Sequence, residues 1–135
     1  MIHVVIDLGN VHDVLRNIEA YIDHIDHVVA YADYVYNGYG VSSRINHPKI
    51  DVIIAETPHK NSADVNIIWD VSRLALRLEN EPLCIIVCTR DLGFLSLKDL
   101  VQKNPKHRLH FAAAWPSIQK ILDEATKDVY ILPSL

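Results

Sequence analysis

The chain has 135 residues, of which 50% are hydrophobic, and a formal net charge of −4 at pH 7. This length and composition suit one compact domain, and the mild acidity argues against a protein that coats nucleic acid through its overall field. No run approaches the roughly 18 consecutive apolar residues of a membrane span, and the start MIHVVIDLGN lacks the basic segment of a secretory signal. We therefore expect a single domain over residues 1–135 in a soluble, cytoplasmic protein without a membrane partner.

The expected strands are short β-branched or apolar runs, and the expected helices have apolar residues at spacings of three and four. In chain order the sequence predicts a strand at 2–6, a helix at 10–22, strands at 27–36 and 50–56, a helix at 62–78, a strand at 83–88, a helix at 94–102, a strand at 108–114, a helix at 117–127 and a last strand at 129–132. Glycines, serines and a proline between 37 and 49 predict a loop.

Strands that alternate with helices and are apolar on both faces are typical of a parallel sheet covered on both sides. We expect an α/β fold, a three-layer sandwich with a mostly parallel central sheet, in which the most apolar strand, 83–88, is central. Cys84 and Cys88 in that strand would lie roughly 13 Å apart, too far for a disulfide. They are interpreted as small core residues in a reducing compartment.

Three aspartates fall where functional groups gather in open parallel sheets, just beyond the carboxyl ends of the strands. The strand 2–6 ends on Asp7, the strand 83–88 is followed closely by Asp91, and Asp64 opens the helix that leads into that second strand. We therefore expect these three carboxylates to converge on one edge of the sheet.

Like-charged carboxylates are costly to hold together unless a cation neutralises them, and hard oxygen ligands suit Mg²⁺ or Mn²⁺. Such an ion would also hold a phosphodiester and orient a water molecule, which indicates metal-dependent hydrolysis of a phosphodiester bond. Asn10 and Thr89 would be neutral polar groups of the site. Lys60, His59 and Arg90 at its rim are candidate phosphate contacts or, with equal weight, solvated loop residues.

Each acid also has a structural alternative. Asp7 is interpreted alternatively as a turn aspartate, Asp64 as a first-turn acid favoured by the helix dipole, and Asp91 as the cap of the next helix. Asp70, six residues after Asp64, is expected to be a neighbour of the site or a surface acid and not a direct ligand. The eight histidines are scattered, which favours solvated or loop histidines over a zinc site.

These motifs resemble those of the PIN-domain nucleases and their NYN relatives. VVIDLGNV, residues 4–11, resembles the first NYN motif, an apolar strand that ends in Asp-x-x-Asn. HKNSADVNIIWDVSRLA, residues 59–75, resembles the helix motif in which a Lys and a small residue precede an Asp, with a second Asp six positions on. IIVCTRDLGFLSL, residues 85–97, resembles the strand-end motif T-x-D-x-x-F, with Phe94 under the site. The resemblance extends over essentially the whole chain, because residues 109–132 also fit the family ending.

The resemblance implies one PIN-like ribonuclease domain that acts on single-stranded or structured RNA. It implies that Asp7, Asp64 and Asp91 coordinate Mg²⁺ or Mn²⁺, and that Asn10 and Thr89 position water or the scissile phosphate.

Two departures from the family pattern leave an alternative open. Many NYN members carry a second acid where this chain has Gly93, and the Glu of toxin-type PIN domains has no clear match, Glu56 and Asp33 being weak substitutes. The alternative is a catalytically weak or inactive PIN-like module that binds nucleic acid or protein. A homodimer and an inhibitory protein partner are further hypotheses.

Overall fold

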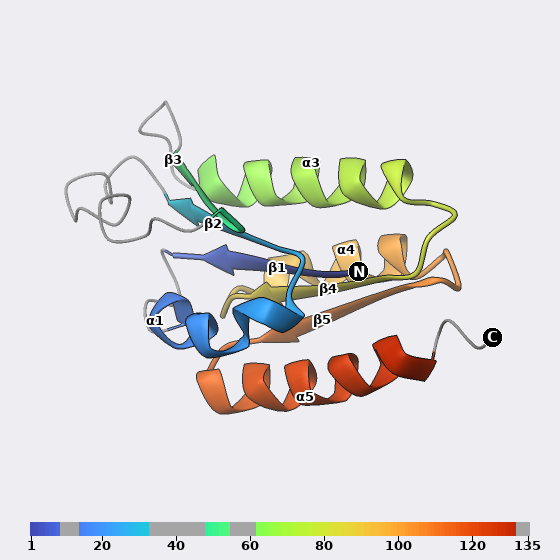
Figure 1. The fold of residues 1–135 in the computed structure, drawn as a ribbon. Helices are drawn as coiled ribbons and strands as arrows, with labels where there is room; N and C mark the ends of the chain where they lie inside the picture. Colours follow the sequence, from blue (N-terminus) through green and yellow to red (C-terminus); the bar gives the residue numbers. More distant parts are fainter. Residues whose placement is uncertain (9–13, 33–47, 55–61, 132–135) are drawn as a thin grey trace.

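A parallel β-sheet with the strand order β3-β2-β1-β4-β5 forms the middle layer of the molecule (Figure 1). The structure is a computed structural model, and it describes residues 1–8, 14–32, 48–54 and 62–131. The elements in chain order are β1 (Ile2–Asp7), α1 (Val14–Ile18), the 3-10 helix η1 (Glu19–His24), β2 (His27–Ala32), β3 (Ile50–Ile54), α3 (Ser62–Arg77), β4 (Leu83–Cys88), the 3-10 helix η3 (Leu92–Phe94), α4 (Leu95–Val101), β5 (His107–Ala112) and α5 (Trp115–Ile131).

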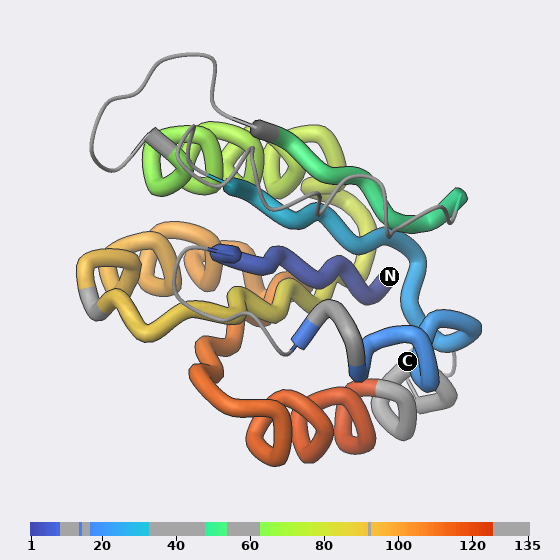
Figure 2. Tube along the Cα trace, turned by 90° about the vertical axis from the view of Figure 1, so that its left-hand side faces the viewer, coloured from blue at the N-terminus to red at the C-terminus, as the bar shows by residue number. Residues whose placement is uncertain are grey.

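Helices cover both faces of this sheet. α3 and α4 lie on one face, and α1, η1 and α5 lie on the other (Figures 1 and 2). All four strand pairs in the described part of the chain are parallel. The expected three-layer α/β architecture with a parallel central sheet is therefore confirmed.

Alternation along the strands divides the hydrophobic core into two clusters, one on each side of the sheet. In β1, Ile2, Val4 and Ile6 pack toward α1 and α5, whereas Val5 packs toward α3 and α4. By the same alternation His3 and Asp7 share the face of Val5. Polar side chains of β1 therefore lie under α3.

The middle strand of the five is β1, so the expectation that 83–88 is central is wrong in detail. β4 is an interior strand between β1 and β5, and its residues are correspondingly buried. Apolar composition shows that a strand is interior but not which interior place it takes, because the crossover connections decide the strand order.

The expected last strand at 129–132 is wrong, because α5 continues to Ile131. Ile118, Leu122 and Ala125 are buried at helical spacing, and position 129 continues that spacing. No Gly or Pro interrupts residues 117–131, so helical continuity overrides the β-propensity of VYIL. The helix begins at Trp115, and Pro116 lies in its first turn, where the missing N–H removes no hydrogen bond.

The other expected elements are found with different bounds. The helix expected at 10–22 is a short α1 followed by η1, and the one expected at 94–102 begins with the 3-10 turn η3. β2 ends at Ala32 and β3 at Ile54. The remaining parts of the expected strands, residues 33–36 and 55–56, lie outside the described residues.

Cys84 and Cys88 both carry free thiols, as expected from their spacing. Burial raises the pKa of the Cys88 thiol, which keeps it protonated and unreactive. No described helix combines the length and the apolar character that crossing a membrane requires.

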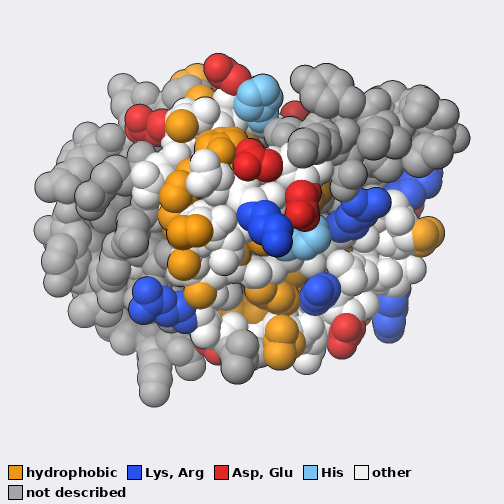
Figure 3. Space-filling view, turned by 90° about the horizontal axis from the view of Figure 1, so that it is seen from below, with side chains coloured by type: hydrophobic (Ala, Val, Ile, Leu, Met, Phe, Trp, Pro, Cys, Tyr) orange, Lys and Arg blue, Asp and Glu red, His pale blue; other side chains and the backbone are white. Residues whose placement is uncertain are grey.

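Charges of both signs are interspersed with hydrophobic side chains on the face shown in Figure 3, and neither sign dominates it. This agrees with the small net charge of the chain. Any recognition of an anionic partner would depend on local groups and not on the field of the whole molecule.

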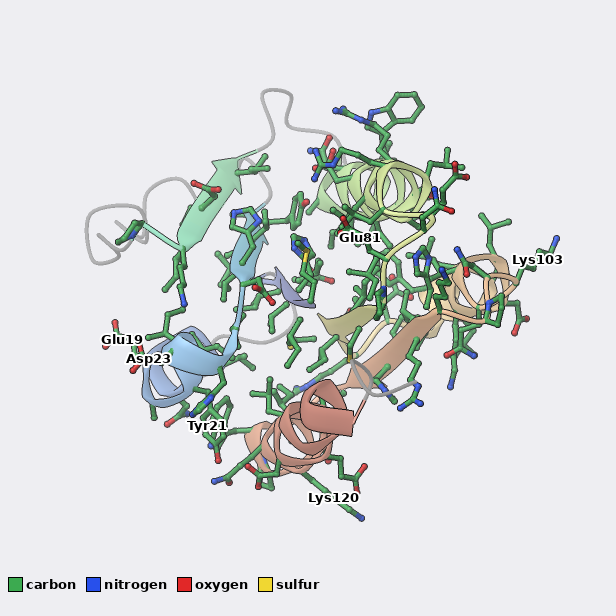
Figure 4. The ribbon with its side chains drawn as sticks, turned by 45° about the vertical axis from the view of Figure 1, so that its right-hand side comes forward. Glu19, Tyr21, Asp23, Glu81, Lys103 and Lys120 are labelled. Atoms are coloured by element: carbon green, nitrogen blue, oxygen red, sulfur yellow. The ribbon has the colours of Figure 1, made fainter. Side chains whose placement is uncertain are left out.

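η1 is held against α5 by an aromatic pair. The rings of Tyr21 and Trp115 meet edge to face with centroids 5.7 Å apart, and the Gln119 amide donates to the Tyr21 hydroxyl over 2.8 Å. Figure 4 shows Tyr21 on the side of η1 that faces α5. This contact closes the helical layer opposite α3.

Leu122→Ala should lower the free energy of unfolding by about 2–5 kcal/mol, because Leu122 is fully buried between α5 and the sheet. Urea denaturation measures this loss. Lys120→Ala, at an exposed position of the same helix, is the control and should change the free energy by no more than about 0.5 kcal/mol. Equal effects of the two variants would contradict the packing of α5.

Candidate acidic site at the carboxyl edge

The site lies where the strand order changes direction, between the carboxyl ends of β1 and β4. The chain adds β2 and β3 on one side of β1, and then returns through α3 to add β4 and β5 on the other side. β1 is followed in the chain by β2 and β4 by β5, on opposite sides of the β1–β4 pair, and open α/β sheets bind ligands at such a reversal of the strand order.

A buried hydrogen bond joins the two strands at this point. The hydroxyl of Thr89, which directly follows β4, donates to Oδ2 of Asp7 at the end of β1 over 3.0 Å. Asp7 and Thr89 are only 2% and 5% exposed. A carboxylate removed from water in this way needs polar partners, and Thr89 supplies one of them.

Asp91 is linked to the same hydroxyl. Its backbone N–H donates to Oγ1 of Thr89 over 3.1 Å, so the hydroxyl accepts from Asp91 and donates to Asp7. Oδ1 of Asp91 in turn accepts the N–H of Gly93 over 2.8 Å. Asp91 thus also closes a tight turn at the start of η3, a local role close to the helix-cap alternative.

Gly93, where an acid is common in the resembling family, lies against the carboxylate of Asp91. A Cβ at this position would be 3.1 Å from Oδ1 of Asp91, closer than about nine in ten real Cβ contacts. A side chain at residue 93 would require the carboxylate to shift by a few tenths of an ångström. The glycine therefore allows the present orientation of Asp91.

Asp64 lies in the first turn of α3, which begins at the carboxyl edge of the sheet (Figure 1). It is half-buried. Within the described ranges no three His, Cys, Asp or Glu side chains are close enough to hold one metal ion. The structure thus links Asp7 and Asp91 through Thr89 and leaves Asp64 on the same edge without completing a three-acid cluster.

The remaining expected site residues divide between the rim and the part that is not described. Arg90 follows Thr89 and is exposed. Phe94 is 2% exposed and belongs to the core cluster on the α3 and α4 side of the sheet. Asn10, His59 and Lys60 lie outside the described residues, and so do the weak substitutes Asp33 and Glu56.

A second polar link beside Asp7 was not anticipated from the sequence. Tyr31 on β2 is the register neighbour of Asp7, and its hydroxyl donates to Oδ2 of Asp70 on α3 over 2.8 Å. Burial, and then the hydrogen bond to Asp70, raise the pKa of Tyr31, so its hydroxyl remains a donor. Asp70, expected as a neighbour or surface acid, thus bonds to a residue next to Asp7.

The sequence spacing indicates on which faces of their elements Asp70 and Tyr31 lie. Asp70 lies three and seven residues after the buried Ile67 and Ala63, on the flank of α3 that faces the sheet. Tyr31 alternates with Val29 on the same face of β2. Their pairing could not be inferred, because it depends on which strand α3 crosses.

A groove of about 380 Å³ extends along β2 away from this link, lined by side chains of β1, β2, β3 and α3. At its far end Nε2 of His27 pairs with Oδ2 of Asp51 at 2.6 Å, and the rings of His3 and His27 are 5.1 Å apart. Burial, and then the positive charges of His27 and Arg77, lower the pKa of His3 to about 4, against a smaller opposing effect of Asp26. His3 is therefore neutral at pH 7.

No family model, curated protein or solved structure matches this chain. We therefore infer a function from the residues of the site and from the motifs that place them.

His3 should make the protein less stable as the pH falls from 6.5 toward 4. Its pKa is about 4 in the folded chain and 6.5 in the unfolded chain, so over this range the unfolded chain binds more protons. At pH 5 the loss relative to pH 7 is about 2 kcal/mol. Urea denaturation at the two pH values should show this loss in the wild type.

The loss attributed to His3 should be absent in His3→Gln. It should persist in His24→Gln, which removes an exposed histidine of η1. The same pH dependence in both variants would contradict the assignment to His3.

Proposed function

We propose that this protein is a metal-dependent ribonuclease that hydrolyses RNA phosphodiester bonds at the carboxyl edge of its sheet. The observation that carries the proposal is the hydrogen-bonded connection from Asp7 through Thr89 to Asp91 across the point where the strand order reverses. It joins a buried acid and a half-buried acid, 84 positions apart in the sequence, at one edge of the sheet.

The donor set suits a hard divalent cation. Asp7 and Asp91 offer carboxylate oxygens, the ligands that Mg²⁺ and Mn²⁺ prefer, and they would hold the ion at this edge. Asp64 is the proposed third ligand, and it would have to move closer to the other two acids to reach the same ion. When bound, the ion would supply charge neutralisation and an activated water for attack at phosphorus. Thr89 would orient Asp7, because its hydroxyl is fixed by the N–H of Asp91.

The resemblance of three ordered motifs to the PIN and NYN nucleases supports RNA as the substrate. Arg90 is exposed beside Thr89, where a guanidinium would contact a phosphate of single-stranded or structured RNA. His59 and Lys60 are the other proposed phosphate contacts. Asn10 is proposed as the polar group that positions water.

Asp91→Asn should abolish metal-dependent cleavage of end-labelled RNA, lowering the rate by roughly 100-fold or more. The fold should persist, because an Asn Oδ1 can accept the Gly93 N–H that Asp91 accepts now. Cleavage is measured with Mn²⁺, with Mg²⁺ and with EDTA. The wild type should cut only with the metals.

Asp99→Asn is the matched control, since it removes one carboxylate charge from an exposed position of α4. It should retain full activity. Millimolar Mn²⁺ should raise the melting temperature of the wild type and of Asp99→Asn but not of Asp91→Asn. An Asp91→Asn protein that cuts as fast as the wild type would refute the nuclease assignment.

A binding module without catalysis is the second candidate, and an exposed apolar face of α3 favours it. Val65, Ile68, Trp69 and Leu76 point away from the sheet at helical spacing, with Trp69 and Leu76 63% and 73% exposed. Exposed apolar side chains grouped on one helix are typical of interaction surfaces. A homodimer through this face is the form of the candidate that can be tested directly.

If α3 mediates a homodimer, light scattering after size exclusion should give a dimer for the wild type and a monomer for Trp69→Gln. Lys98→Gln on α4 is the control and should leave the dimer intact. A wild-type monomer at all concentrations, together with metal-dependent cleavage, would exclude this candidate.

A further inference from the structure

The groove beside the acidic site follows β2 under the flank of α3. Its floor is formed by His27, Val29 and Tyr31, alternate residues that point to the α3 side of the sheet. One wall comes from α3, including Arg73 and Arg77. Its volume, about 380 Å³, is within the range of ligand-binding clefts.

Both acids of the groove already have partners. Asp51 pairs with His27, and Asp70 accepts the hydroxyl of Tyr31. Neither Arg73 nor Arg77 makes a hydrogen bond or an ion pair with another residue in the described part of the chain. Two guanidinium groups therefore line the groove with their donors available.

The spacing of the two arginines matches a phosphate-bearing ligand. Arg73 and Arg77 are four residues apart on α3, so they lie on the same flank about 6 Å apart along the helix axis. A guanidinium presents a planar fork of N–H donors that fits two phosphate oxygens. Burial is the largest cause of the lowered His3 pKa, and the positive charges of His27 and Arg77 lower it further.

The groove ends beside the acidic site, at Tyr31 and Asp70. Tyr31 is the register neighbour of Asp7, and it lines the groove together with Asp70. From Asp70 to Arg77 the axis of α3 advances about 10 Å toward the amino edge of the sheet. A chain that leaves the acidic site along β2 would therefore pass both arginines.

We propose that this groove binds the phosphates of an RNA strand through Arg73 and Arg77, next to the scissile phosphate at the carboxyl edge. This proposal rests on the proposed function for the identity of the strand. Phosphate contacts of this kind fix the position of the strand without reading its sequence.

The test measures binding of a short fluorescein-labelled single-stranded RNA by anisotropy in EDTA, so that no metal-dependent cleavage contributes. Arg73→Gln/Arg77→Gln is compared with Lys103→Gln/Lys120→Gln, which removes the same charge elsewhere. Figure 4 shows both lysines pointing outward, Lys120 from α5 on the far side of the sheet from α3, and Lys103 from the chain just after α4. Both arginines and both lysines are exposed, so circular dichroism should show all variants folded.

The arginine variant should bind the RNA at least about tenfold more weakly than the wild type. The slope of the logarithm of its binding constant against the logarithm of the salt concentration should decrease in magnitude by about 1.4, because each lost phosphate contact on a single strand accounts for about 0.7. The lysine variant should change both quantities much less. Equal weakening of the two variants, or no binding by the wild type, would overturn the proposal.

A competition arm separates an RNA chain from a free nucleotide. Adenosine 5′-monophosphate should displace the labelled RNA only weakly, because it offers a single phosphate to two arginines. Displacement as efficient as that by unlabelled RNA would overturn the assignment to a chain.

The outcomes also separate this groove from the nuclease activity. Loss of binding in the arginine variant without any cleavage by the wild type would refute the nuclease and support the groove. Metal-dependent cleavage with unchanged binding by the arginine variant would support the nuclease and refute the groove.

Discussion

The hydrogen bond from Thr89 to Asp7 connects the two halves of the sheet at the edge where the proposed chemistry takes place. Asp7 is almost fully buried, and a carboxylate in that position is tolerated only with polar partners. Thr89 provides one partner because β1 and β4 are adjacent and parallel, with Ile6 opposite Cys88. The neighbouring turn then depends on the same hydroxyl, since it accepts the N–H of Asp91. The position of both acids therefore follows from the strand order.

α3 relates the acidic edge to the rest of the molecule because it presents three different surfaces. Its buried residues, such as Ile67 and Val71, pack on the sheet. Its polar flank carries Asp70, bound to Tyr31, and the two arginines of the groove. Its outer face carries Trp69 among other exposed apolar side chains. One amphipathic helix thus carries both the proposed nucleic-acid groove and the proposed protein-binding face, on separate sides.

The histidines of the groove show how a polar side chain is accommodated at the amino end of the sheet. His3 follows the alternation of β1 and points under α3, where burial keeps it neutral at pH 7. His27 is more exposed and pairs with Asp51 on the neighbouring strand. The groove therefore contains one neutral imidazole ring and one ring that pairs with Asp51. Its permanently charged cations are the two arginines. The proposed phosphate binding would therefore persist across the neutral pH range, because guanidinium groups do not titrate there.

The sequence by itself determined the fold class, most elements and the edge on which the acids lie. Alternating apolar strands and amphipathic helices require a covered parallel sheet, and the carboxyl ends of such strands meet at one edge. The local pattern gave a wrong element where the β-propensity of a short segment competed with the continuity of a helix. Residues 129–131 include β-branched residues, yet they lie in helix α5. Only the tertiary structure decided that β1 is the middle strand, that Thr89 bridges Asp7 and Asp91, and that Asp70 binds Tyr31. The Tyr31–Asp70 and Asp7–Thr89 contacts join residues 39 and 82 positions apart, and the turn at Asp91 depends on the second of them. The crossover connections decide these contacts because they place the helices on the strands, and no local pattern specifies them.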